Sequence, residues 1–260
     1  MRAMIPEPML PLVLDRFFPV ISGPDELHRA VELVEARAGE FCASLRIDSE
    51  MVAEVCRFGF LPMSEDFSGH ELLLVKVHED RCLLDPEELH VSKSTRRRSR
   101  GLELAIDHEF DGCLDAIVAH HPQRWLTDRL CESIRALHRA PRHGVAMHSV
   151  EVYDGARLVA GEIGYTCGAV YTSLSGFHRV SGTGAVQLAT LGVILRDAGF
   201  VFWDLGMVIE YKLELGARVF GRHEFLELYR QSAQHRTPDL TGRAECRDVL
   251  RRAPGYSSTG

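Results

Sequence analysis

Residues 144–177 read GVAMHSVEVYDGARLVAGEIGYTCGAVYTSLSGF and carry the clearest fold signal in the chain. Apolar and polar residues alternate over 148–153 and again over 157–166. Between them stands Asp154-Gly155, a dipeptide typical of a tight hairpin turn. A third strand is expected over 169–174, so the stretch predicts the centre of a β-sheet.

A glycine turn and a helix follow this sheet. Residues 179–185 read RVSGTGA, and leucines then recur at helical spacing over 188–195 until Gly199 offers a C-terminal stop. Another strand is expected over 200–205. The pattern therefore predicts a strand that leads into a glycine turn, which in turn opens a helix.

Arg179, Gly182 and Gly184 are candidate phosphate-binding residues of this turn. Glycine lets a backbone approach an anion closely, and the free amides and positive dipole end of a helix favour phosphate. The spacing R-x-x-G-x-G/A resembles the pyrophosphate loop of the GNAT acyltransferases. A sharp turn without any ligand is the alternative.

Composition excludes several classes of protein. The 260 residues are 45% hydrophobic and 26% charged, as in ordinary globular chains, and no apolar run approaches the roughly 20 residues that span a bilayer. The seven cysteines are widely spaced and include no C-x-x-C pair, which favours reduced thiols and argues against zinc. The thirteen histidines include no H-E-x-x-H arrangement, so no metal is expected.

One segment is strongly basic although the net charge is −7. Lys93, Arg96, Arg97, Arg98 and Arg100 stand within eight residues. A local patch of this kind can neutralise phosphates whatever the total charge, because the local field depends on nearby charges. A solvated surface segment is the alternative.

The rest of the chain alternates helical and strand patterns. Helices are expected over 27–43, 48–58, 110–119 and 125–137, and strands over 72–77, 81–84 and 102–106. Residues 78–80 would form the turn between the strands at 72–77 and 81–84. After Tyr229 the chain becomes polar, and 253–260 are expected to be disordered.

Several separated motifs occur in one order along the chain. They are Gly59-Phe60-Leu61-Pro62-Met63, Leu89-His90-Val91-Ser92-Lys93-Ser94, Arg96-Arg97-Arg98, Trp125-Leu126, His148-Ser149-Val150-Glu151-Val152, Asp204 and Leu215-Gly216-Ala217. Together they resemble the leucyl/phenylalanyl-tRNA–protein transferases over most of 55–229. The resemblance implies an α+β fold: a small N-terminal α+β domain (1–84), a GNAT-like acyltransferase domain with a mixed, mostly antiparallel sheet (85–231), and a polar, partly disordered tail (232–260).

The resemblance also implies a reaction. Members of that family move a Leu- or Phe-like aminoacyl group from the 3′ end of a tRNA to the N-terminal amine of a protein that begins with Arg or Lys, in the N-degron pathway of protein degradation. This aminolysis of an ester needs a deprotonated amine and positioned donors, without a cofactor or a metal. The implied partners are charged tRNA and a protein N-terminus, and a cytoplasmic monomer without a membrane anchor is expected.

Two sets of residues match family motifs with a direct role in this chemistry. Asp204 matches a strand-end carboxylate that orients the incoming amine or accepts its proton; a helix-capping aspartate is the alternative. Lys93, Arg96, Arg97 and Arg98 match the basic segment that holds the tRNA acceptor stem through its phosphates.

A second group matches the family's substrate-binding residues. Trp125 matches an aromatic side chain that packs by the terminal adenosine, and a core tryptophan is the alternative. Ser175 and Phe177 match the pocket loop, and Glu151 belongs to the H-S-V-E-V block. We therefore expect these four residues to contact substrate.

The chain departs from the family pattern at two working positions. Leu174 stands where G-E-S-M-F has an acid for the ammonium of the amino acid, and Gly206 replaces the glutamine of D-C-Q. The paired tryptophans before the basic segment are also absent. Glu162 and Glu210 are conceivable substitutes, but salt-bridge partners are the favoured interpretation of both.

Three functions follow, in this order of preference. The first is a tRNA-dependent aminoacyltransferase that acts on peptide N-termini. The second is a GNAT N-acyltransferase that uses an acyl-CoA, as the 179–184 turn would allow. The third is a non-catalytic homologue that binds tRNA or peptides, which the losses at Leu174 and Gly206 would explain.

Overall fold

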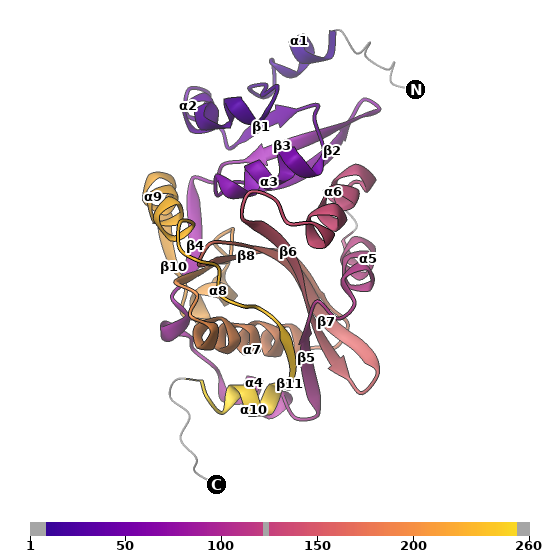
Figure 1. Ribbon diagram of the computed structural model, residues 1–260, viewed down its shortest axis with the longest axis vertical. Coiled ribbons are helices and arrows are strands. Elements are labelled where there is room, and N and C mark those ends of the chain that lie inside the picture. The colour runs from indigo at the N-terminus through magenta and orange to yellow at the C-terminus, as the bar shows by residue number, and fades with distance from the viewer. Residues whose placement is uncertain (1–8, 122–124, 254–260) are drawn as a thin grey trace. The chain divides into compact units, whose positions relative to one another are not determined.

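The computed structural model describes residues 9–121 and 125–253 (Figure 1). Helices and strands are interspersed along the chain. The strands form two β-sheets, and the larger sheet is mixed but mostly antiparallel. The predicted α+β fold class is therefore confirmed. Within the described residues, no helix is both long enough and apolar enough to cross a membrane.

The chain divides into two compact units that are not consecutive in sequence. Residues 1–79 and 121–146 form the first unit, and residues 80–120 and 147–260 form the second. The predicted domains 1–84 and 85–231 were consecutive. The structure places the boundary at Glu79 and assigns 121–146 to the first unit, because the helix in that segment packs on the first unit's own helix.

The first unit is built on a three-stranded antiparallel sheet. Its strands lie in the order β1 (Phe41–Ser44), β3 (His70–Lys76) and β2 (Leu61–Phe67). Its described helical segments are α1 (Leu10–Leu14), the 3-10 helix η2 (Pro24–Arg29), α2 (Ala30–Glu35), α3 (Ser49–Arg57) and α6 (Asp128–Arg139). Helix α3 begins as predicted after Asp48, whose Oδ1 accepts a hydrogen bond from the backbone N–H of Met51 at 2.9 Å.

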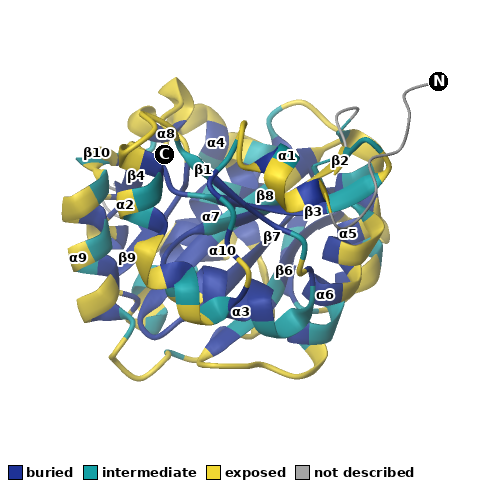
Figure 2. Ribbon diagram, turned by 90° about the horizontal axis from the view of Figure 1, so that it is seen from above, coloured by how far each residue is buried: buried dark blue, intermediate teal, exposed yellow. Residues whose placement is uncertain are grey.

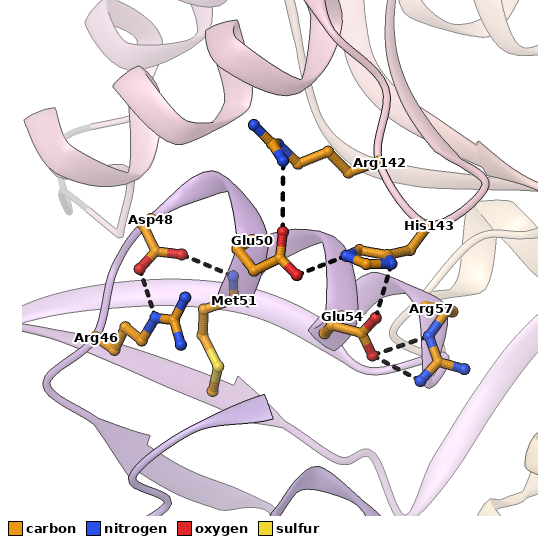
Figure 3. Close-up of polar contacts among 8 residues, drawn as sticks. All are labelled: Arg46, Asp48, Glu50, Met51, Glu54, Arg57, Arg142 and His143. Atoms are coloured by element: carbon orange, nitrogen blue, oxygen red, sulfur yellow. Dashed lines mark hydrogen bonds and ion pairs between the residues drawn. The ribbon is translucent and has the colours of Figure 1, made fainter. Parts of the chain in front are cut away.

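A polar network joins α3 to the turn that follows α6 (Figure 3). His143 lies between two carboxylates of α3, with Nε2 2.7 Å from Glu50 Oε1 and Nδ1 3.3 Å from Glu54 Oε1. Arg142 reaches the other oxygen of Glu50 at 3.5 Å, and Arg57 donates to Glu54 at 2.6 Å. Since most of these groups are partly exposed, each pair adds at most about 1 kcal/mol, and the network mainly fixes the turn.

The second unit is built on an eight-stranded sheet. Its order is β10 (Arg218–Gly221), β4 (Asp80–Leu84), β9 (Phe202–Asp204), β8 (Val170–His178), β7 (Arg157–Cys167), β6 (Val145–Asp154), β5 (Leu102–Ile106) and β11 (Gly242–Glu245). Strands β8 and β9 are parallel, whereas β10–β4, β4–β9, β7–β8, β5–β6 and β5–β11 are antiparallel. Strand β7 is buried along most of its length (Figure 2).

Helices cover both faces of this sheet. They are the 3-10 helix η3 (Pro86–Glu88), α4 (Lys93–Arg98), α5 (Phe110–His120), α7 (Thr183–Ala198), α8 (Glu210–Glu214), α9 (Arg222–Ser232) and α10 (Cys246–Leu250). On β7, Gly161 faces Cys113 of α5, whereas the next residue, Glu162, bonds to Gln187 of α7. Because successive strand residues point to opposite faces, α5 and α7 lie on opposite sides of the sheet.

The central elements of the second unit match the sequence predictions. Strands β6 and β7 form the expected hairpin, with Gly155 in the turn at φ +59°. Helix α7 ends at Gly199 in the left-handed conformation, as predicted. The strand at 102–106 and the helix at 110–119 are also confirmed, the helix extending to His120.

Three predictions in the outer parts of the chain are wrong. The helix expected over 27–43 ends at Glu35, because Ala38 takes a positive φ of +50° and 41–44 pairs with β3. The strands that contain 72–77 and 81–84 do not form a hairpin, since β3 and β4 belong to different sheets.

The third correction concerns the expected polar tail, 232–260. Strand β11 pairs with β5, and α10 packs on α7 with Cys246, Val249 and Leu250 in the core. These apolar side chains make the segment a part of the second unit, although its other residues are polar. Residues 254–260 lie outside the described residues.

Candidate active site

A cavity of about 470 Å³ opens within the second unit. Its walls come from β8, the first turns of α7, α8 and the segment before α4. Among the residues predicted from the sequence, Ser175, Phe177, Gly182 and Gly184 line it. The pocket loop and the glycine turn, which the sequence predicted separately, therefore share one cavity.

The glycine turn forms the N-terminus of α7 at the cavity wall. Gly182 is the N-cap residue with φ +86°, and no side chain caps the helix. A Cβ at Gly182 would come within 2.5 Å of Arg98 Nη1, so the guanidinium of Arg98 lies directly against the turn. The helix amides and a cation thus meet at one place, which is an arrangement that favours phosphate.

The other predicted cations occupy different positions around α4. This helix is capped by Ser92, whose Oγ accepts from the backbone N–H of Thr95 at 3.1 Å. Lys93 and Arg97 are exposed, whereas Arg96 donates to the carbonyl of Leu250 at 2.6 Å and so anchors α10. The predicted basic segment is therefore a short helix in which one arginine serves the fold.

Arg179 does not line the cavity, although it belongs to the predicted phosphate loop. Its Nη1 donates to the carbonyl of Leu158 at 3.0 Å, and its guanidinium lies over the Phe177 ring at 5.3 Å. The guanidinium therefore packs on the Phe177 ring, which lies near His120 of α5.

Glu162 is a buried carboxylate in the cavity wall, with 3% of its surface exposed. Its Oε1 accepts hydrogen bonds from Tyr171 Oη at 2.9 Å and from Ser173 Oγ at 2.8 Å, and its Oε2 accepts one from Gln187 Nε2 at 2.8 Å. Burial raises the pKa of the Glu162 carboxyl. Among the described residues Glu162 has no ion-pair partner, so the interpretation as a salt bridge is wrong for this residue.

Lys212 also lines the cavity, although no motif in the sequence pointed to this residue. Its Nζ donates to the carbonyls of Leu205 and Met207 at 2.6 and 2.9 Å, which fixes the loop after β9. Burial lowers the pKa of the Lys212 amine. The other predicted substitute, Glu210, is exposed at the start of α8.

Asp204 is completely buried and is not among the residues that line the cavity. Its Oδ1 accepts from Arg81 Nε at 2.8 Å and from the backbone N–H of Gly206 at 2.9 Å. Its Oδ2 accepts from Arg81 Nη2 at 2.7 Å and from Thr172 Oγ1 at 3.1 Å. All four lone-pair positions are thus engaged, and Asp204 caps no helix because α8 begins later, after Ile209.

Glu151 and Trp125 lie elsewhere. Glu151 Oε1 accepts from Ser149 Oγ at 2.6 Å and from the backbone N–H of Glu109 at 3.1 Å, which ties β6 to the start of α5. Burial raises the pKa of this carboxyl. Trp125 belongs to the first unit, where its carbonyl accepts from Ser64 Oγ at 2.7 Å. Neither residue lines the cavity.

Metal-ligand groups do not add to this picture. In the described ranges, no three His, Cys, Asp or Glu side chains are grouped so that they could hold a metal ion. The seven cysteines are free and buried, and burial raises the pKa of Cys113 well above its ordinary value. The polar side chains that line the cavity carry carboxylate, amide, hydroxyl, imidazole and amine groups.

A family model and individual relatives both assign the chain to one protein family. A sequence model described as leucyl/phenylalanyl-tRNA protein transferase matches residues 83–230. The chain is 32% identical over 208 residues to a leucyl/phenylalanyl-tRNA--protein transferase of Pseudomonas aeruginosa (strain UCBPP-PA14), covering 78% of this chain and 89% of that protein. It is 31% identical over 194 residues to the enzyme of the same name from Pseudomonas fluorescens (strain Pf0-1), covering 73% and 83%. Among solved structures, FemX aligns over 81% of this chain and 78% of its own at 10% identity, with a TM-score of 0.45.

Proposed function

Because this chain belongs to the leucyl/phenylalanyl-tRNA protein transferase family, we propose that it moves an aminoacyl group from a charged tRNA to the N-terminal amine of a protein. It is a transferase by family. The region matched by the family, 83–230, contains all the residues that line the cavity. The reaction is therefore assigned to the cavity of the second unit.

One observation carries this assignment. The basic helix α4 and the N-terminus of α7 meet where Arg98 lies against Gly182, at the wall of the cavity. The 3′ end of a tRNA presents phosphates close to its aminoacyl ester, so a phosphate site beside a substrate cavity matches that donor. Lys93 and Arg97, exposed on the same helix, extend the positive charge along the acceptor stem.

In the reaction the amine nitrogen attacks the ester carbonyl carbon, and the bond from that carbon to the ribose oxygen breaks. The amine loses a proton, and the tRNA hydroxyl gains one as it leaves. We propose that Asp204 acts as a positioning residue, because it holds the Gly206 amide and Arg81 while its own oxygens are fully engaged. Leu205 next to it lines the cavity, so a shift of this loop would reach the substrate.

A transfer assay tests the proposal. Purified protein is mixed with tRNA that carries labelled leucine or phenylalanine and with a peptide that begins with Arg, and labelled peptide is the expected product. Transfer should fall as salt rises, because phosphate contacts release counterions. Arg98→Ala should weaken tRNA binding and reduce the salt slope by about one.

Arg243→Ala is the matched control, since Arg243 is an exposed arginine of β11 that pairs with Glu103 outside the cavity lining. It should leave both affinity and slope unchanged. Absence of labelled peptide across a panel of charged tRNAs and acceptor peptides would refute the proposal.

The alternative donor is an acyl-CoA, because the open amides at Gly182 and Gly184 would also suit a pyrophosphate. Saturating acetyl-CoA should then raise the melting temperature, and charged tRNA should compete.

For the preferred reaction, we propose that the protein acts in the cytoplasm, because its donor is charged tRNA and its cysteines are free thiols. We also propose that it acts as a monomer. Sedimentation with and without tRNA measures the oligomeric state.

A further inference from the structure

Glu162 and Glu151 are two buried carboxylates of the second unit to which neutral groups alone bond, and of the two Glu162 is the one that lines the cavity. Tyr171 and Ser173 donate to Oε1, and Gln187 donates to Oε2. Among the described residues none forms an ion pair with it. A buried carboxylate is normally paired with a cation, since an unpaired buried charge is costly.

The cationic side chain nearest in the cavity is turned elsewhere. Lys212 Nζ donates to the carbonyls of Leu205 and Met207, so its charge stabilises the loop after β9. The positive charge of Lys212 favours the ionised form of Glu162, but Lys212 donates no hydrogen bond to this carboxylate. The cavity wall therefore holds a carboxylate whose counter-ion is not provided by any residue that the structure describes.

Gln187 adds a second acceptor beside this carboxylate. Its amide nitrogen faces Glu162 Oε2, which leaves its Oε1 without a hydrogen bond from any described residue. Gln187 also lines the cavity. Oε2 of Glu162 accepts a single hydrogen bond, so one lone pair there remains open as well. Two neighbouring acceptors, one of them charged, match a ligand that brings several N–H donors and a positive charge.

We infer that Glu162 and Gln187 form a binding site for a cationic nitrogen of the aminoacyl group that is transferred. This inference rests on the proposed function and names what the cavity recognises. An ammonium group would donate to Glu162 Oε2 and Gln187 Oε1 and would neutralise the buried charge. The remaining wall, with Leu174 and Leu188, would contact the apolar part of the same group.

The nitrogen can come from two sources, the α-ammonium group or a basic side chain. Transfer to the Arg-starting peptide is therefore measured with tRNA charged with phenylalanine, phenyllactate, lysine or norleucine. Phenyllactate replaces only the α-ammonium by a hydroxyl, and norleucine replaces only the side-chain ammonium by a hydrogen atom. Wild-type protein should discriminate within one of these two pairs by about 10- to 100-fold in kcat/KM.

Glu162→Gln keeps the size of the side chain and removes the charge. Its amide oxygen can still accept from Tyr171 and Ser173, whereas its amide nitrogen can only donate, so the Gln187 amide has to turn its oxygen toward it. The variant should abolish that discrimination by slowing transfer of the cationic member to the rate of its neutral partner. Glu103→Gln, which removes one negative charge from β5 outside the cavity lining, should keep the wild-type ratio. Should Glu162→Gln fail to fold, Gln187→Met serves the same comparison with an expected smaller loss.

Binding of small esters separates this inference from the proposed function. If the site binds the α-ammonium group, phenylalanine methyl ester should raise the melting temperature of wild-type protein more than the methyl ester of phenyllactate. If it binds a basic side chain, lysine methyl ester should raise it more than norleucine methyl ester. That preference should vanish in Glu162→Gln. Such a result without any tRNA-dependent transfer would sustain the site and refute the tRNA reaction. Transfer with unchanged ratios in Glu162→Gln would overturn the site alone.

Discussion

At the scale of single residues, two buried carboxylates of the second unit differ in their partners. Asp204 is paired with Arg81 and has every oxygen lone pair engaged. Glu162 has neutral donors alone among the described residues and lines the cavity. The first arrangement is that of a structural ion pair, and the second leaves charge for a ligand.

Substitution of Asp204 should therefore act first on stability. Asp204→Ala leaves the Arg81 guanidinium buried without a counter-ion, and the expected cost is about 3–5 kcal/mol in the free energy of unfolding by denaturant. The double variant Arg81→Met/Asp204→Leu should recover most of that loss, because apolar groups replace the pair.

The double variant also distinguishes positioning from proton transfer. If Asp204 positions the loop through Gly206, the stable double variant should raise KM and keep a measurable kcat. A fall in kcat of about 100-fold or more at unchanged KM, with an altered pH profile, would instead identify Asp204 as the proton acceptor.

The stability of Glu162→Gln relative to the wild-type protein should increase as the pH rises. Burial raises the pKa of Glu162 above its unfolded value of roughly 4.3, so its contribution to stability is greatest below that pH and is lost as the pH rises through the folded-state pKa. The groups that face it are Tyr171, Ser173 and Gln187, with Lys212 acting at a distance.

Since glutamine does not titrate, the variant should gain about 1 kcal/mol over wild type at pH 8 and nothing below pH 4. Urea unfolding across this pH range measures the difference. Greater stability combined with lost discrimination is the signature of a functional site, whereas lower stability at pH 8 would show that the charge serves the fold.

At the scale of elements, α7 connects the fold to the site. The sequence predicted its start and end from the glycines at both termini, and the structure has both glycines in the left-handed conformation. The helix N-terminus was thereby expected at a phosphate site. The contact with Arg98 of α4 was not predictable, because strands β5 to β8 lie between the two segments along the sequence.

Two glycines of this turn should respond differently to alanine. Gly182→Ala forces an L side chain into φ +86° and against Arg98, so a loss of about 1–2 kcal/mol or more is expected, together with weaker tRNA binding. Gly184→Ala meets ordinary contacts at 3.7 Å from His178 inside α7, so it should be neutral or stabilise by up to about 1 kcal/mol. Equal losses of stability in thermal unfolding would contradict this reading of the turn.

At the scale of the whole molecule, the segments that close each unit come from distant parts of the sequence. Residues 121–146 belong to the first unit, and β11 and α10 complete the second. The polar composition of 232–260, the segment that contains β11 and α10, predicted a tail, because few residues of this segment are apolar. Those few are the ones that face the core.

Leu250→Ala tests the place of α10. Leu250 is 2% exposed in the core of the second unit, so truncation should cost about 2–5 kcal/mol in the free energy of unfolding. Val219→Ala on β10, where the side chain is 47% exposed, is the control and should stay within about 0.5 kcal/mol. Equal stability of the two variants in denaturant unfolding would place α10 outside the cooperative core.

Local patterns in the sequence were enough to predict the central elements of the second unit, and the order of its motifs was enough to predict the family. The β6–β7 hairpin and α7 depend on turn residues, caps and periodicity within short windows. Only the tertiary structure decided which buried acid is paired. Arg81 lies 123 residues from Asp204, and Gln187 lies 25 residues from Glu162. Such partners meet through strand order and helix packing, which no local pattern encodes, and they determine which carboxylate is left to meet a substrate.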